Sequence, residues 1–273
     1  MATFEIATEP QSGVPETEET LNQQDTEKMS SLAGQRLEPG VRREEPAAEE
    51  SAVEVSGEEK RKVTRLDPKR LPVHASVVEA CSRATATLDG PNLAFLGVTS
   101  SVRGEGRTSI ATAMAFVQAH DYGRSTILID ADFEGPSVAG LFGLDQAPGL
   151  ADVLRERIDL EDAVHDVGDG LSVLTAGKVD SPPGLAAKLA ESKILQDLQT
   201  EHEVVVVDLP AIIDSRCGTV LAALFEQPLL VIRAGITPAK KVGEALEQLD
   251  REPTALLNGT RTSLPRWIRR LLE

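Results

Sequence analysis

The sequence has few cysteines, no metal-binding histidine pattern and no long apolar run, and each shortage excludes a class of protein. Its two cysteines, Cys81 and Cys217, are too few for a disulfide scaffold or a zinc site, and they suit a reducing cytosol. The four histidines have no metal-ligand spacing, so a bound metal would be a hard ion held by oxygen atoms. No apolar stretch approaches the roughly 20 residues of a membrane-spanning helix. No signal peptide is recognisable, so we expect a soluble, cytoplasmic protein.

Positive charge and aromatic residues are also scarce. The chain has 28 Lys and Arg against 44 Asp and Glu, which gives a formal net charge of −16. Such a chain would be repelled by a phosphate backbone, so nucleic acid is not expected as a partner. The single tyrosine, Tyr122, is interpreted as a turn residue after a predicted helix.

Residues 1–67 are predicted to form a disordered acidic tail and linker. The segment is rich in Glu, Gln, Ser, Thr and Pro and lacks sustained apolar periodicity. It therefore cannot bury enough surface to offset the entropy lost on ordering. An acidic interaction tail and a solvated extension are both compatible with this composition, and we favour the second.

Residues 68–263 are predicted to form an α/β domain, because apolar runs alternate with amphipathic stretches. Continuous apolar strands between helices indicate a parallel sheet covered by helices on both faces. The main expected strands are 93–99, 125–130, 203–210, 228–235 and 254–258, and the main expected helices are 75–88, 107–121, 184–200 and 238–250.

A glycine-rich turn joins the first of these strands to the helix that follows it. Gly104 and Gly106 allow backbone N–H groups to converge, and the helix N-terminus adds partial positive charge, so the turn predicts an anion-binding loop. The phosphate-loop pattern G-x-x-x-x-G-K-[ST] is incomplete, since Ser101 replaces the first glycine and Arg107 replaces the lysine. Thr108 stands where a hydroxyl would bind Mg²⁺. An ordinary glycine turn at a helix start is the alternative.

Three aspartates end apolar strands and support the first interpretation. Asp130 and Asp132 follow one strand, and Asp208 ends another. Ligands of parallel sheets bind beyond the carboxyl ends of the strands, where the glycine loop is also expected. Each aspartate alone could be a turn former or helix cap, but together with the loop they indicate a P-loop NTPase-like fold.

Five segments carry a family resemblance. They are TSSVRGEGRTS (99–109), ILIDADFEGPSVAGLFGL (127–144), LTAGKVDSPPGLAAKLAES (174–192), EVVVVDLPAIID (203–214) and VIRAGITPAKKVGEALEQL (231–249). In this order they resemble the bacterial tyrosine kinases that pair with polysaccharide co-polymerases in capsule and exopolysaccharide export. These kinases are related to the MinD and ParA ATPases. The resemblance covers residues 68–273.

The resemblance implies ATP and Mg²⁺ as cofactors, with Thr108 and Asp208 as metal ligands. It implies that Asp130 polarises the attacking hydroxyl, that Asp132 supports the site, and that Arg107 stands at the catalytic lysine position. The phosphates would be bound by the loop residues Ser101, Arg103, Gly104, Glu105, Gly106, Arg107, Thr108 and Ser109. The implied partner is a membrane polysaccharide co-polymerase or another export protein. A homo-oligomer and a location at the inner face of the cell membrane are also implied.

Several positions depart from the family pattern. Arginine keeps the lysine's charge at Arg107, but its planar fork is longer and orients differently. Arg103 stands at the family's proline position and could partly compensate for the change at Arg107. Glu134 stands where a base is usual and would repel phosphate. The family's C-terminal tyrosine cluster is missing from this sequence, so autophosphorylation of a tyrosine tail is not expected. The family's oligomerisation helix is poorly kept, because Glu79 matches but Arg83 is out of register.

The segment 264–273, LPRWIRRLLE, is predicted to be a basic amphipathic helix. Packing on the domain or docking to a partner is favoured, and a peripheral membrane contact is the alternative.

Three functions are compatible with these observations. The favoured one is an ATP-binding regulator of capsular or exopolysaccharide synthesis or export with weak or lost catalysis, which is a pseudoenzyme. The second is an active protein tyrosine kinase or ATPase acting on a partner protein. The third is a scaffold module that binds no nucleotide.

Overall fold

The computed structural model describes residues 73–87 and 93–259. The chain divides into the units 1–58 and 59–273, and every described residue belongs to the second unit. The predicted acidic tail and the predicted helix at 264–273 lie outside the described residues. The proposed domain boundaries therefore stay predictions.

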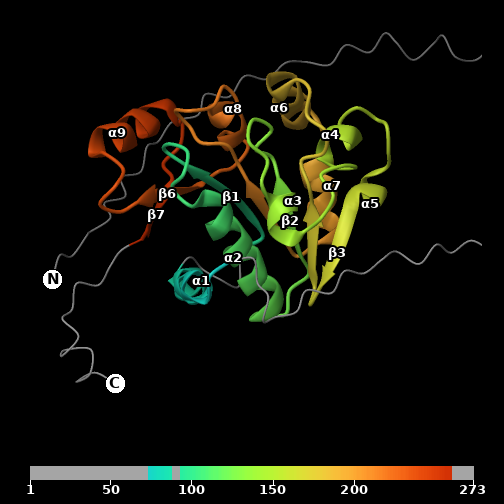
Figure 1. Cartoon of the computed structure of the whole chain (residues 1–273), viewed down its shortest axis with the longest axis horizontal. Coiled ribbons are helices and arrows are strands. Elements are labelled where there is room, and N and C mark those ends of the chain that lie inside the picture. Colours follow the sequence, from blue (N-terminus) through green and yellow to red (C-terminus); the bar gives the residue numbers. More distant parts are fainter. Residues whose placement is uncertain (1–72, 88–92, 260–273) are drawn as a thin grey trace, which may run out of the picture. The chain divides into compact units, whose positions relative to one another are not determined.

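Seven strands form one sheet in the order β3-β4-β2-β5-β1-β6-β7 (Figure 1). Their pairing is parallel except between β3 and β4. Every residue of β2 and β5 is buried, as the continuous apolar runs predict for strands covered on both faces. The predicted α/β class is confirmed. The strands are β1 (Phe95–Ser100), β2 (Thr126–Asp130), β3 (Val164–Gly168), β4 (Leu171–Leu174), β5 (Val204–Asp208), β6 (Leu229–Arg233) and β7 (Thr254–Asn258).

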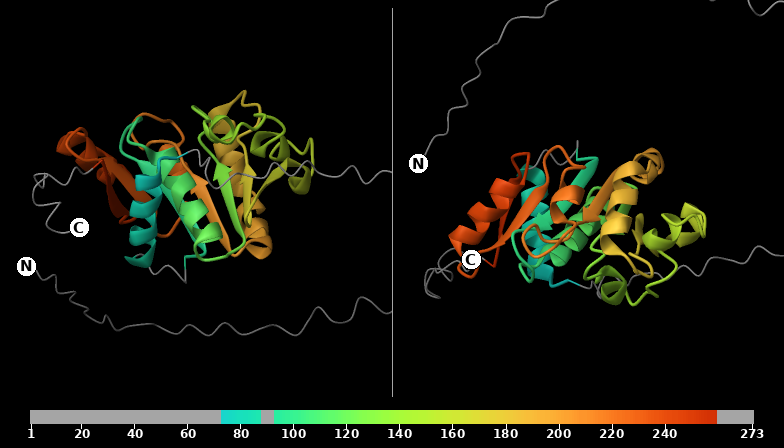
Figure 2. Two further views of the ribbon diagram at one scale, coloured as in Figure 1. Left: turned by 60° about the horizontal axis from the view of Figure 1, so that its bottom comes forward. Right: turned by 90° about the horizontal axis from the view of Figure 1, so that it is seen from above.

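Helices cover both faces of the sheet, as Figure 2 shows from two further directions. One face packs against α2 (Arg107–His120) and α3 (Val138–Phe142), with α1 (Ala75–Thr87) lying against α2. Buried residues of the remaining helices join the cluster on the other face. These helices are α4 (Leu150–Val153), α5 (Leu160–Ala163), α6 (Pro182–Glu191), α7 (Ile194–Glu201), α8 (Gly218–Ala222) and α9 (Ala239–Gln248).

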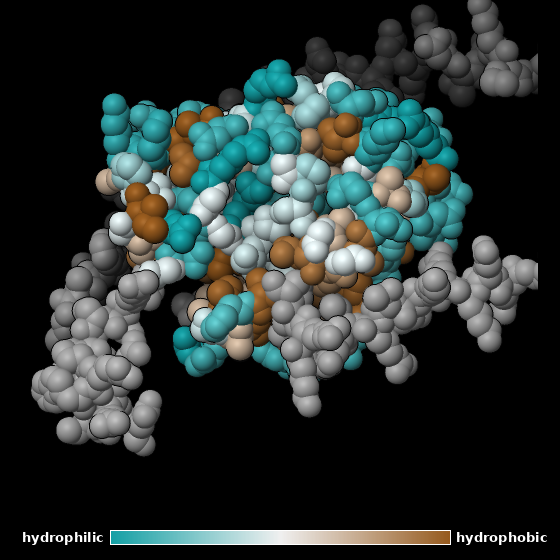
Figure 3. All heavy atoms as spheres, in the orientation of Figure 1, coloured by the Kyte–Doolittle hydropathy of each residue, from teal (hydrophilic) through white to brown (hydrophobic). Residues whose placement is uncertain are grey.

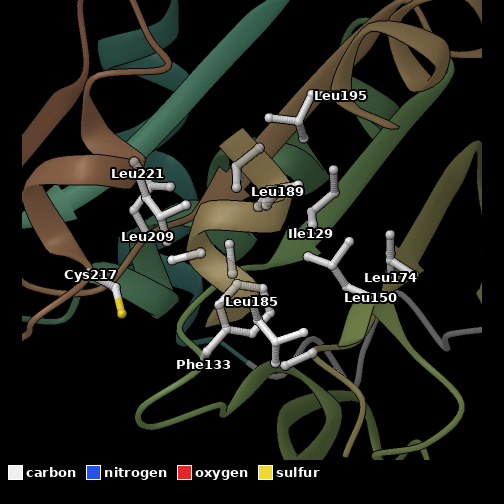
Figure 4. Packing of buried hydrophobic residues seen from close by; sticks show 14 of the residues in the cluster. Ile129, Phe133, Leu150, Leu174, Leu185, Leu189, Leu195, Leu209, Cys217 and Leu221 are labelled. Carbon is white, nitrogen blue, oxygen red and sulfur yellow. The ribbon is translucent and has the colours of Figure 1, made fainter. Parts of the chain in front are cut away.

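The cluster on the second face is built mainly from aliphatic side chains. Figure 4 shows Leu185 and Leu189 of α6 packed with Ile129 of β2 and with Phe133, which follows that strand. Phe133 therefore anchors the segment that leads from β2 into α3. This packing fixes the direction in which the acidic end of β2 leaves the sheet.

The predicted single helix over 184–200 is wrong, because the structure has α6 and α7 with a break at Ser192. The Ser192 backbone N–H donates to Lys188 O and its hydroxyl donates to Leu189 O, while its ψ of 166° is extended. A serine side chain that bonds the preceding turn competes with the helix, which ends α6 here.

The hairpin of β3 and β4 was not among the predicted elements. Its two-residue loop is Asp169-Gly170, and both residues have positive φ, 52° and 78°. Tight hairpin turns of this kind favour an Asp-Gly pair. The dipeptide is therefore the sequence signal for the antiparallel strand β3 at the sheet edge.

Gly97 of β1 gives a test of this packing. A Cβ atom added there would lie 2.6 Å from the ring of Phe225, which is itself stacked on Phe95 with 4.4 Å between ring centroids. We expect Gly97→Ala to lower the free energy of unfolding by about 1–3 kcal/mol, as overpacking of a full core does. Urea unfolding followed by circular dichroism measures this change.

Gly140 of α3 is the matched control, because a Cβ atom there meets nothing within 4 Å. Gly140→Ala should leave stability unchanged or raise it slightly, since alanine favours a helix. Equal stability of the two variants would contradict the described packing between β1 and Phe225.

Candidate nucleotide-binding site

The glycine loop lies between β1 and α2 at the carboxyl end of the sheet, where Figure 1 shows β1 leading into α2. Gly104 and Gly106 have φ values of +83° and +89°, which only glycine adopts easily. At Gly106 a Cβ atom would also lie 2.3 Å from Asn258 Nδ2. Glycine is therefore required at Gly104 by the backbone turn, and at Gly106 by both the turn and the close approach of Asn258.

A cavity of about 250 Å³ opens over this loop. Most of the residues predicted to bind phosphate line it, and so does Asp132, which follows β2. In Figure 3 hydrophilic residues predominate over the upper part of the face shown. The cavity is lined by Ser100, Arg103, Gly104, Gly106, Arg107, Thr108, Ser109, Asp132 and Gly135.

Glu105 is buried within the loop and holds its shape. One carboxylate oxygen accepts a hydrogen bond from Val102 N at 2.8 Å. The other accepts from Arg233 N at 3.1 Å and from the Thr237 hydroxyl. Asn258 Nδ2 donates to the Glu105 carbonyl at 2.8 Å. The loop is therefore tied to the ends of β6 and β7, and the Glu105 side chain faces these donors.

Sequence reasoning missed Arg233, Thr237 and Asn258, which hold the loop through these bonds. They are separated from Glu105 by 128, 132 and 153 residues along the chain. No local pattern signals such contacts. The register of β6 with β7, which pairs Arg233 with Asn258, brings two of them together.

The structure brings the predicted aspartates together below the loop. Asp130 and Asp208 are register partners at the ends of the adjacent strands β2 and β5, and both are fully buried. Asp132 is also buried, at the edge of the cavity. Parallel strands that end side by side thus gather three carboxylates in one place, as expected from their positions.

Arg107 lies between two of these carboxylates. Its Nε donates to Asp208 Oδ1 at 2.8 Å, and its Nη2 donates to Asp132 Oδ2 at 2.6 Å. The side chain is only 9% exposed. Both pairs are short, charge-assisted bonds of the strong kind. The planar guanidinium joins the ends of β2 and β5, which a single ammonium group could not do with the same geometry.

Asp130 makes different contacts. Its Oδ2 accepts from the backbone N–H groups of Ser137 and Val138, each at 2.9 Å, and its Oδ1 accepts from Asp132 N at 3.2 Å. The carboxylate therefore holds the turn that leads into α3. The role of polarising a hydroxyl stays a prediction.

Burial and charge shift the pKa values of this cluster. Burial first, and then the charge of Asp208, raise the pKa of Asp130 to about 7, against the backbone hydrogen bonds from Val138 and Ser137. Burial also raises the pKa of Asp208, opposed by Arg107 and by the Thr108 hydroxyl. Burial lowers the pKa of Arg107, but Asp208 and Asp132 outweigh it and raise that pKa above its ordinary value.

Glu134, expected to repel phosphate, lies between two arginines. Its Oε2 is 3.1 Å from Arg103 Nη2, and its Oε1 is 3.7 Å from Arg216 Nε and accepts from Arg216 N at 3.2 Å. Its negative charge is thus paired with Arg103, which is itself a loop residue that lines the cavity, and lies close to Arg216.

The remaining predicted residues occupy separate positions. Thr108 and Ser109 line the cavity, and Thr108 Oγ1 accepts from the Ser137 hydroxyl at 3.2 Å. Ser101 is buried, and its hydroxyl has no hydrogen-bond partner among residues 73–87 and 93–259. Asp130 and Asp208 are fully buried and are not part of the cavity lining.

This loop, helix and acidic strand ends together define the chain as a P-loop NTPase-like protein. The kinase domain of the Escherichia coli tyrosine kinase ETK superposes with a TM-score of 0.66 at 22% identity, over 77% of this chain and 87% of that domain. The septum site-determining protein MinD of Pyrococcus horikoshii, complexed with Mg-ADP, gives 0.50 at 22% identity over 66% and 80%. These two similarities show the fold.

Sequence comparison defines the family. The VpsO kinase domain is 31% identical, with a TM-score of 0.59, over 68% of this chain and 94% of that one. The tyrosine-protein kinase YwqD of Bacillus subtilis is 31% identical over 175 residues, which are 61% of this chain and 72% of YwqD. The chain belongs to the bacterial tyrosine kinase family. No protein-family model matches it.

Coverage differs among the relatives. The chain spans 72% of YwqD but only 21% of the putative tyrosine-protein kinase EpsB of Ralstonia solanacearum and 23% of the Escherichia coli tyrosine-protein kinase etk. Within the described ranges, no helix has the length and apolar character needed to cross a bilayer.

The raised pKa of Asp130 predicts a pH effect on stability. A carboxyl with a folded pKa of about 7 and an ordinary value of 3.8 binds more protons in the folded state between these pH values. The free energy of unfolding should therefore fall as pH rises, by about 2 kcal/mol from pH 5 to pH 7 from this group alone. Asp130→Asn should remove this contribution to the decrease in the free energy of unfolding.

Urea unfolding at pH 5 and pH 7 measures the difference between wild type and variant. Asp145→Asn, at an exposed position beyond α3, is the control and should follow the wild type. The account of Asp130 would be rejected by identical pH dependence in wild type and Asp130→Asn.

Proposed function

We propose that this chain binds ATP and regulates capsular or exopolysaccharide synthesis or export, with phosphoryl transfer weak or lost. One observation carries the proposal. Arg107, at the position of the P-loop lysine, is held by Asp132 and Asp208, while the backbone loop beside it keeps its open cavity.

The loop supports the binding part. Gly104 and Gly106 give the backbone the turn in which successive N–H groups make a concave anion site, and α2 begins at Arg107 with the favourable end of its dipole. Two arginines, Arg103 and Arg107, line the same cavity. A nucleotide phosphate is the ligand that this set of groups suits.

The ion pairs of Arg107 support weak catalysis. Phosphoryl transfer depends on positioned charges that follow the moving phosphoryl group. If Arg107 moved to the phosphates, the buried carboxylates of Asp132 and Asp208 would lose their partner, and breaking a buried pair typically costs about 3–5 kcal/mol. Asp130 Oδ2 already accepts hydrogen bonds from the backbone N–H groups of Ser137 and Val138, so this oxygen is less able to accept a proton from a hydroxyl.

The polysaccharide and the partner rest on family membership. A membrane polysaccharide co-polymerase or another export protein is the proposed partner, and the inner face of the cell membrane is the proposed location. A homo-oligomer is part of the same proposal. The acidic tail and the segment 264–273 are candidate contact regions for these partners.

An active tyrosine kinase is the second candidate. Its support is that relatives such as YwqD are named tyrosine-protein kinases, and that arginine keeps the positive charge of the missing lysine. Tyr122, which is 40% exposed, is the single tyrosine of the sequence. Because this sequence has no tyrosine cluster, a substrate tyrosine on a partner protein suits this candidate better.

Calorimetry with ATP and with a non-hydrolysable analogue, beside a phosphate-release assay, separates these candidates. We expect wild type to bind ATP and to release phosphate at the rate of the buffer blank. Arg107→Lys should bind ATP and release phosphate at least about tenfold faster than the buffer blank. The reason is that a lysine side chain can move from the aspartates to the phosphates. Phosphate release by wild type that disappears in Asp208→Ala would instead establish the active enzyme.

Arg103 is predicted to offset the charge of Glu134 at the rim. Arg103→Ala should weaken ATP binding about tenfold, or about 1.4 kcal/mol, because it removes a cation from the cavity lining and leaves the nearby charge of Glu134 without this partner. The double variant Arg103→Ala/Glu134→Gln should recover part of this loss. Arg216→Ala is the control, since Arg216 pairs with Glu134 but does not line the loop cavity. Equal affinity of Arg103→Ala and wild type would contradict this role.

A further inference from the structure

We propose that Arg107 is a built-in cation that takes the place of Mg²⁺, so that the site binds a nucleoside di- or triphosphate without a metal ion. The inference rests on the proposed nucleotide binding and specifies the chemical form of the ligand. Its basis is that the residues expected to hold Mg²⁺ do not fit that ion in this arrangement.

The expected metal ligands already have partners. Asp208 Oδ1 accepts from Arg107 Nε at 2.8 Å, and Thr108 Oγ1 accepts from the Ser137 hydroxyl at 3.2 Å. Mg²⁺ requires an almost ideal octahedron of oxygen atoms and keeps several of its waters. An ion binding here would have to displace the guanidinium and enter the space beside a fully buried carboxylate.

One oxygen of the cluster, Asp208 Oδ2, accepts no hydrogen bond from any described residue. Of the two Asp208 oxygens, it is the one that is free to coordinate a metal ion. It is also buried, so a hydrated ion cannot reach it unless side chains move. The adjacent Arg107 would repel a divalent cation strongly, because charges interact with little screening inside a protein.

Arg107 can serve a phosphate and its aspartates together. A guanidinium has five N–H donors in a planar fork. Here Nε and Nη2 are bound to Asp208 and Asp132, while Nη1 has no hydrogen-bond partner among the described residues. Arg107 lines the loop cavity, so its charge and remaining donors are next to the proposed phosphate position. Neither ion pair has to break when the ligand binds.

A lysine at this position would behave differently. Its single ammonium group could move to the phosphates and leave Asp208 free for a metal. Arg107→Lys is therefore the matched variant that should restore a metal requirement. Both side chains carry one positive charge, so the comparison changes geometry and not net charge.

The test measures how Mg²⁺ changes ADP affinity, by calorimetry in EDTA and in millimolar Mg²⁺. Mg²⁺ complexes free ADP, so a site for metal-free ADP should bind it more weakly when Mg²⁺ is present. We expect wild type to lose affinity at least about twofold, and Arg107→Lys to gain at least about threefold. Equilibrium dialysis with Mn²⁺ and saturating ADP is the second readout, with no Mn²⁺ retained by wild type and about one per chain by Arg107→Lys.

The outcomes separate the two proposals. Stronger binding of ADP to wild type in Mg²⁺, or one Mn²⁺ retained per wild-type chain, overturns the metal-free site and leaves nucleotide binding intact. No binding of ADP or ATP in either buffer rejects nucleotide binding itself. The wild-type result decides the question alone if Arg107→Lys does not fold.

Discussion

The site depends on one interaction, in which the guanidinium of Arg107 is held between the carboxylates of Asp132 and Asp208. It links the ends of two neighbouring strands to the first turn of α2. All three side chains are buried, so each charge relies on the others for compensation. A group held this firmly can stabilise a bound anion, but it cannot readily follow a phosphoryl group as it transfers.

The phosphate loop above this cluster is held separately, by the buried carboxylate of Glu105. Its bonds to Val102 and to the ends of β6 and β7 hold the loop, and none of these bonds involves Arg107. Glu105 therefore holds the shape of the loop, whereas Asp132 and Asp208 hold the charged side chain at the lysine position. The structure has both sets of contacts, and Arg107 keeps a positive charge at the lysine position while it is bound to Asp132 and Asp208.

The sequence predicts the positions of the acidic cluster but not its pairing. Periodicity places the glycine loop and the three aspartates at the carboxyl ends of strands, because continuous apolar runs mark those strands clearly. The conformation of Arg107 depends on contacts across 25 and 101 residues, which no local pattern contains. The break at Ser192 was missed for a different reason, since one side-chain hydrogen bond outweighs a continuous apolar pattern. The hairpin turn at Asp169-Gly170 does carry a local signal.

The central claim is that Arg107 stays paired with Asp132 and Asp208 when a nucleotide is bound. Hydrogen exchange of arginine Nε–H groups, followed by ¹⁵N NMR and assigned by the loss of one signal in Arg107→Lys, tests it most directly. The account predicts one strongly protected Nε–H that stays protected after ADP is added. Exchange of Arg107 Nε–H as fast as that of exposed arginines, or loss of protection on adding ADP, would contradict it.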